Sequence, residues 1–169
     1  MRNSIMFSKY LHDDAATLKA LDDDGYFRTG DIARREDDYY FILGRASIDI
    51  MKSGGYKISA LDIEREILGL EYVAEVMVVG VEDEEFGQRV AAAIVLRDDL
   101  KDRLTIDELR HDLRGSLAGY KMPTLLRVVP ELRKNATGKV IKKVLVGEIF
   151  SEAHSDIQRW TSSKAQSKL

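Results

Sequence analysis

The sequence contains no cysteine, which excludes a disulfide framework, thiolate catalysis and a cysteine-based zinc site. The three histidines, His12, His111 and His154, are scattered and lack the spacing of metal ligands. No apolar run approaches the length of about 18 to 20 residues that a membrane-spanning helix needs, and the first residues lack the apolar segment of a signal peptide. We therefore expect no histidine-based metal site and no membrane span.

Charge of one sign is also not concentrated anywhere in the chain. The 26 basic and 29 acidic residues are spread along the sequence and leave a net charge of −3. No basic face is dense enough to predict a nucleic-acid partner. The 169 residues, 44% of them hydrophobic, can bury the core of one domain, or of one domain plus an appendage.

The first third of the chain predicts a short helix followed by two hairpins. Acidic residues favour a helix start at 13–21, and aromatic and β-branched residues predict strands on either side of the polar turn 35–38. A second, tighter hairpin turns at Gly54 and Gly55, because glycine reaches positive φ without steric cost. This loop should be narrow and able to approach a ligand closely. The predicted strands are 27–34, 39–43, 48–52 and 56–58.

The rest of the chain alternates strands and helices. Ser59 is placed to cap a helix through Asp62, and Thr105 with Glu108 forms a capping box. In the first of these helices Leu61, Glu64 and Leu68 share one face. The predicted helices are 59–68, 105–116 and 140–150, and the predicted strands are 73–81, 89–96 and 124–129. This order predicts an α+β fold with a three-stranded sheet, packed helices and a preceding β-hairpin.

Four short segments carry chemistry: Gly25-Tyr-Phe-Arg-Thr-Gly-Asp31, Gly44-Arg45, Lys52-Ser-Gly-Gly-Tyr-Lys57 and Asn135-Ala-Thr-Gly-Lys139. A fixed carboxylate such as Asp31 can accept both vicinal hydroxyls of a ribose, although an aspartate in such a segment, taken alone, more often ends a strand and caps a turn. Lys139 can neutralise charge on a phosphate, although most loop lysines are simply solvated. A Walker A loop is excluded, because Val140 follows Lys139 and Arg133 replaces the first glycine.

Together the four segments resemble the carboxy-terminal signature of acyl-CoA synthetases, in the adenylate-forming enzyme superfamily. The run from Gly44 to Leu61, followed by Gly87-Gln-Arg89, is most similar to malonyl-CoA synthetases. The resemblance implies an acid-thiol ligase that converts a carboxylate, ATP and CoA into acyl-CoA, AMP and pyrophosphate. It implies that residues 1–44 end a large AMP-binding domain, 45–150 form the small carboxy-terminal domain and 151–169 form a tail.

The resemblance also assigns residues to the adenylation step. Lys139 would stabilise the transition state of adenylation, Asp31 would bind the ATP ribose, and Arg45 would contact ribose and phosphate. Mg²⁺ would arrive with ATP, with its ligands outside this chain. This chain departs from the family at one point. The family usually has a proline shortly before the lysine, where this chain reads Leu132-Arg-Lys-Asn135. This difference bears on where the loop lies more than on its chemistry.

A second group of residues is implied in the thioester step and in domain rotation. Gly54 and Gly55 would line the channel for the pantetheine arm of CoA, and the flanking Lys52 and Lys57 would meet CoA phosphates or remain solvated. The hinge is Ser47 when counted from Arg45 and Asp49 when counted back from the glycines. Both positions stay open at this point.

The sequence ends in Ser167-Lys168-Leu169, a tripeptide that the peroxisomal import receptor reads. We expect a peroxisomal location, with the cytoplasm or the mitochondrion as alternatives.

Two hypotheses follow for the chain as a whole. In the first it is part of a ligase, and the isolated chain forms no acyl-adenylate because the large domain is missing. In the second it is a stand-alone, non-catalytic module that binds nucleotide or another protein.

Overall fold

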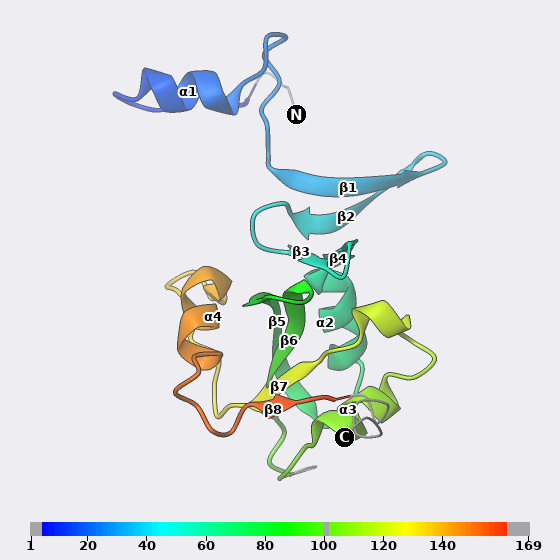
Figure 1. The fold of residues 1–169 in the computed structure, drawn as a ribbon. Coiled ribbons are helices and arrows are strands. Elements are labelled where there is room, and N and C mark those ends of the chain that lie inside the picture. The colour runs from blue at the N-terminus through cyan, green and yellow to red at the C-terminus, as the bar shows by residue number, and fades with distance from the viewer. Residues whose placement is uncertain (1–4, 100–101, 162–169) are drawn as a thin grey trace.

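The structure, a computed structural model, describes residues 5–99 and 102–161. Its amino-terminal arm carries helix α1 (Asp14–Ala20) and the hairpin β1 (Asp31–Glu36) and β2 (Tyr39–Arg45), which lies above a mixed domain of sheet and helices (Figure 1). Asp13 caps α1 by accepting from the Ala16 amide, as the acidic start predicts. The helix buries no residue, so the arm is held by its turns more than by a core.

The first hairpin forms around the predicted polar turn, with Glu36 opposite Tyr39. Its first strand begins at Asp31, four residues later than predicted, because Gly30 adopts a φ of +76° and turns the chain there. All six residues of β1 and most of β2 are exposed.

The second hairpin joins β3 (Ile50–Ser53) to β4 (Tyr56–Ser59) and leads directly into α2 (Ala60–Leu68). Ser59 performs the predicted capping role, since its hydroxyl accepts from the Asp62 amide and also donates to the Leu43 carbonyl at 2.6 Å. Helix α2 buries Ala60, Ile63 and Ile67, while Leu68 is 51% exposed. The isoleucine face therefore packs into the core, whereas on the other face Leu61 and Glu64 are partly buried and Leu68 is exposed.

Strand β6 (Gly87–Leu96) organises the sheet. It pairs antiparallel with β5 (Val73–Asp83) along their full length and parallel with β7 (Leu125–Val128), which pairs with β8 (Gln158–Arg159). Along the chain, helix α3 (Ile106–Asp112) and the short 3-10 turn η1 (Gly119–Lys121) connect β6 to β7, and α4 (Lys142–Ile149) follows β7.

Two hydrophobic clusters pack against the sheet. Because side chains alternate along a strand, Val78 joins the cluster of α2 and α3, whereas its neighbours Met77 and Val79 join that of α4. Among the described residues no helix has the length and apolar character to cross a bilayer.

The predicted α+β class is confirmed, but the sheet is larger than predicted. The three predicted strands are β5, β6 and β7, and the described sheet adds β8 and the β3–β4 hairpin, for six strands in all. Strand β8 was missed because only two residues pair, and the amide of Gln158 anchors them through Ile106 and Leu104. Gln158 and Arg159, within the segment predicted as a tail, thus pair with the sheet, and Trp160 packs against the core.

Helix α3, predicted at 105–116, is shorter than predicted. It ends at Asp112 instead of about Ser116, because the chain leaves the helix after Leu113 and Gly115 takes a φ of +93°.

Replacing Gly44 should destabilise the fold. Its φ is +124°, and a Cβ there would overlap the Cβ of Asp49. We expect Gly44→Ala to lower the free energy of unfolding by at least about 1–3 kcal/mol. Gly147→Ala is the matched control, because Gly147 lies in α4 with open space around it, and it should raise stability by about 0.5–1 kcal/mol. Urea denaturation measures both; equal effects of the two variants would contradict the close approach of Gly44 and Asp49.

Candidate functional site

The two residues expected to bind nucleotide, Asp31 and Arg45, lie directly opposite each other across the first hairpin. Arg45 Nε is 3.6 Å from Asp31 Oδ1, and the two side chains are 67% and 35% exposed, respectively. The Ala46 amide donates to the Gly30 carbonyl at 3.0 Å, which holds the two chain segments together beyond the last pair. The structure therefore brings both residues together at one exposed end of the hairpin.

Residues 45–49 form the linker between the first hairpin and β3, and both hinge candidates lie in it. The Asp49 amide donates to the Arg45 carbonyl at 2.8 Å, and Asp49 Oδ2 accepts from the Arg45 amide at 3.0 Å. These two bonds close the linker into a tight turn. Ser47 is exposed, whereas the Asp49 side chain is only 14% exposed.

An ion-pair cluster that sequence reasoning missed holds the linker from the other side. Lys142 Nζ lies 2.7 Å from Asp49 Oδ1 and 2.8 Å from Glu64 Oε1, and Glu64 Oε1 also accepts from the Val78 amide at 2.7 Å. All three charged side chains are nearly buried, with exposures of 13–14%. The sequence signal was a charge, Glu64, on a helix face otherwise occupied by leucines.

The glycine loop between β3 and β4 has the predicted form. Gly54 and Gly55 have φ values of +55° and +83°, which a two-residue type I′ turn requires. Lys52 and Lys57 are cross-strand partners, and both are exposed. Beside the loop lies a cavity of about 680 Å³, which Gly54 lines together with Tyr56, Phe86, Arg89, Arg110 and Tyr120. The rings of Tyr56 and Tyr120 stack 4.3 Å apart.

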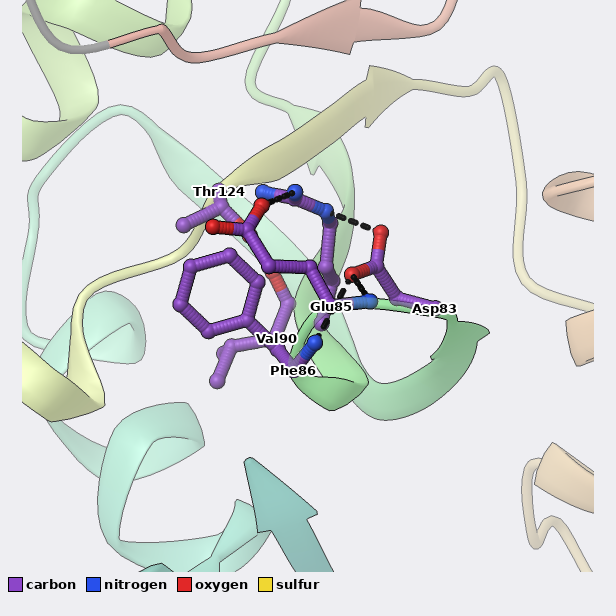
Figure 2. Close-up of polar contacts among 6 residues, drawn as sticks. Asp83, Glu85, Phe86, Val90 and Thr124 are labelled. Atoms are coloured by element: carbon purple, nitrogen blue, oxygen red, sulfur yellow. Dashed lines mark hydrogen bonds and ion pairs between the residues drawn. The ribbon is translucent and has the colours of Figure 1, made fainter. Parts of the chain in front are cut away.

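The turn between β5 and β6 supports this loop. Gly54 donates its amide to the Phe86 carbonyl at 2.9 Å. Asp83 Oδ1 accepts from the amides of Glu85 and Phe86, as Figure 2 shows, and Asp83 Oδ2 forms an ion pair with Arg89. The Arg89 guanidinium also lies over the Phe86 ring, 4.7 Å from its centre. The hydrogen bond from Arg89 holds the pKa of Asp83 below its ordinary value.

Lys139 lies in an exposed loop that is shaped by Asn135. The side-chain Oδ1 of Asn135 accepts from the backbone amides of Thr137 and Lys139 and from the Thr137 hydroxyl, and the backbone amide of Asn135 donates to the Lys139 carbonyl at 2.9 Å. Gly138 completes the turn with a φ of +77°. Within the described part of the chain the Lys139 ammonium has no ion-pair partner, so it can meet an anionic ligand without first losing one.

Two further predictions concern the carboxy-terminal tripeptide and metal binding. Ser167, Lys168 and Leu169 lie outside them. In residues 5–99 and 102–161 no group of three acidic or histidine side chains is placed to hold a metal ion.

Comparison with known proteins identifies the relatives of the chain. Residues 62–139 match the model of the AMP-binding enzyme C-terminal domain. The mitochondrial malonate–CoA ligase of Xenopus laevis is 41% identical over 152 residues, which are 90% of this chain and 26% of that protein. The chain thus spans about a quarter of the length of this curated relative.

Solved structures show the same fold. The ATP-bound crystal structure of MatB from Rhodopseudomonas palustris superposes with a TM-score of 0.75 at 33% identity, over 87% of this chain and 29% of that one. The apo crystal structure of the same enzyme gives 0.62 at 34% identity over the same shares. Our chain is therefore arranged more like the ATP-bound structure than like the apo one.

The Asp83–Arg89 pair should make stability depend on acid pH. Because the pKa of Asp83 is lower in the folded state than its ordinary value of 3.8, its contribution is complete above pH 3.8 and is lost as pH falls through the folded-state pKa. Asp83→Asn should therefore lower the urea midpoint at pH 7, and the difference from the wild type should shrink near pH 2. Glu85→Gln, at a side chain 75% exposed, is the control and should change little. A difference that stays constant with pH would contradict the shifted pKa.

Proposed function

We propose that this chain is the carboxy-terminal part of an ATP-dependent acyl-CoA ligase, because residues 62–139 match the model of the AMP-binding enzyme C-terminal domain. The observation that carries the proposal is the superposition on ATP-bound MatB, which extends over 87% of the chain and so includes more than the matched domain. The names of the relatives favour malonate as the acid.

In the first half-reaction a carboxylate oxygen attacks the α-phosphorus of ATP, and pyrophosphate leaves. The transition state gathers negative charge on the α-phosphate, which the Lys139 ammonium, exposed and with no ion-pair partner among the described residues, is suited to neutralise. Asp31 would accept the two ribose hydroxyls, and Arg45 would lie beside the ribose and phosphate. Mg²⁺ would enter with ATP; the described residues offer it no cluster of ligands, and we assign it no step here.

In the second half-reaction the CoA thiol attacks the acyl carbonyl, and AMP leaves. The cavity beside Gly54 supports a path for the pantetheine arm, because the glycine loop has no side chains to obstruct a thin ligand. The exposed ammonium groups of Lys52 and Lys57 would meet CoA phosphates at its rim.

We assign residues 1–44 to the end of a large AMP-binding domain and residues 45–150 to the small domain. The packing of β8 and Trp160 supports extending the small domain beyond 150, to about residue 160. The linker at 45–49 is then the boundary at which the small domain would pivot, through Ser47 or Asp49.

Lys139→Ala tests the ligase proposal in the chain fused to an amino-terminal domain equivalent to the rest of its relatives. Adenylation, measured by ATP–pyrophosphate exchange with malonate, should fall roughly a hundred- to a thousand-fold, as when one transition-state donor is removed. Thioester formation from supplied acyl-adenylate should fall much less. Lys143→Ala, at a neighbouring exposed lysine, is the control.

Equal losses in both half-reactions would show that Lys139 acts in folding instead of adenylation. The chain without the added domain should stay at background, because only part of the nucleotide site is present. Robust exchange by this chain alone would overturn the division of the enzyme into two parts.

The compartment that we propose from Ser167-Lys168-Leu169 is the peroxisome, reached through its import receptor when these residues form a free carboxy terminus. The name of the Xenopus laevis relative instead supports the mitochondrion. A fluorescent protein fused to the amino terminus should give a punctate signal that becomes diffuse when Leu169 is deleted. A diffuse signal from both fusions rejects the peroxisome, and a fusion at the carboxy terminus then tests mitochondrial import.

A further inference from the structure

We propose that Lys142 is a positioning residue that locks the linker at 45–49 in the arrangement used for adenylation, through its ion pair with Asp49. The proposal rests on the function proposed above. It goes beyond that function by assigning a role to Lys142. This residue would act on the linker and on the loop of Lys139 and would not contact the substrate.

Lys142 connects two parts of the chain whose relative position matters for the proposed reaction, the loop of Lys139 and the linker at 45–49. It is the first residue of α4 and stands three positions after Lys139, and an isolated bridge between Lys134 and Val140 closes the loop that contains Lys139. Its ammonium lies 2.7 Å from Asp49 Oδ1, in the linker. One ion pair therefore connects the loop of Lys139 to the boundary between the hairpin and the small domain.

The two carboxylates that share Lys142 are held differently. Glu64 belongs to α2 and accepts from the Val78 amide of β5, so it is fixed to the core of the small domain. Asp49 belongs to the linker, where its other oxygen accepts from the Arg45 amide. A change of linker backbone would move Asp49 away from Lys142, while Glu64 would remain to pair the ammonium. Lys142 thus has a permanent partner and an exchangeable one.

The Lys142–Asp49 pair forms in an arrangement of the chain that is more similar to a nucleotide-bound structure than to an apo structure. Superposition gives a TM-score of 0.75 on ATP-bound MatB and 0.62 on apo MatB, each over 87% of this chain. Asp49 also packs against Gly44, which has no room for a Cβ, so the carboxylate has one well-defined position in this arrangement. The geometry assigns the closed Lys142–Asp49 pair to the adenylation step.

The pair is buried enough to act as a lock. Lys142 and Asp49 are 13% and 14% exposed, so solvent screens their attraction much less than that of the Asp31–Arg45 pair. Removing the ammonium leaves two carboxylates facing each other with little solvent between them, which should drive Asp49 out of its position.

Hydrogen exchange of the chain itself tests the lock without any need for ligase activity. In Lys142→Met the amides of Arg45 and Ala60, which donate to Asp49, should exchange roughly tenfold faster, as expected when one hydrogen bond is lost. Asp49→Asn should have the same effect, whereas Lys142→Arg should restore slow exchange. Lys143→Met is the matched control, because Lys143 is the adjacent, exposed lysine.

Unchanged exchange at Arg45 and Ala60 in Lys142→Met would overturn the proposal. So would an equal acceleration throughout β5 and β6, because that result would mean a general loss of stability.

The fused enzyme then tests the link to catalysis. Lys142→Met should lower the kcat of adenylation about tenfold with little change in the KM for ATP, and should leave thioester formation from supplied acyl-adenylate unchanged or faster. Lys142→Arg should restore adenylation. Equal losses in the two half-reactions would reject the positioning role. If the fused wild-type enzyme is inactive, the ligase proposal fails, and the exchange experiment still decides whether Lys142 locks the linker.

Discussion

Strand β6 is the element on which the rest of the small domain depends. Among the described strands it alone has three partners, antiparallel β3 and β5 and parallel β7, and its centre is the small-residue run Ala91-Ala-Ala93. Alternation sends Ala92 and Ile94 to the cluster of α2 and α3, and Ala91 and Ala93 to that of α4. Because alanine occupies little volume, helices on both faces approach the sheet closely, and the loops at its edge are held in place.

The residues proposed to have chemical roles lie outside this core, in turns that the core positions. The glycine loop is fixed by a hydrogen bond from the Gly54 amide to the Phe86 carbonyl at the β5–β6 turn, and the loop of Lys139 is shaped by Asn135 before α4 begins. Such an arrangement combines a rigid scaffold with exposed groups that can reach a ligand. It also explains why these residues can be exposed and still be well placed, because hydrogen bonds to backbone groups fix the geometry of their loops.

Two ion pairs near the linker have opposite physical characters. The Asp31–Arg45 pair is largely exposed, and pairs of this kind contribute only about 0–1 kcal/mol, so ribose hydroxyls could replace Arg45 beside Asp31 at small cost. The Lys142 cluster is nearly buried, and breaking it is expensive unless another partner remains. A weak pair where a ligand would enter and a strong pair where the chain would pivot fit the proposed two-step reaction.

Local features of the fold could be predicted from the sequence, because the information lies within a few residues. The Ser59 cap, the Thr105–Glu108 capping box and the two hairpin turns depend on neighbours three or four positions away, and all of them form as predicted. The same holds for the four motif segments, which predicted the family that the comparisons then found. Strand and helix ends were less accurate where single glycines, Gly30 and Gly115, bend the chain.

Long-range features depended on the tertiary structure. Lys142 and Asp49 are 93 positions apart, and no local pattern relates them. Strand β8 pairs through only two residues, and its Gln158 meets Ile106 at a separation of 52. The sequence alone determined the helices and strands other than β8, their order and the family, since periodicity and capping act locally. Only the folded chain decided which charges are buried together, because burial depends on how distant segments pack.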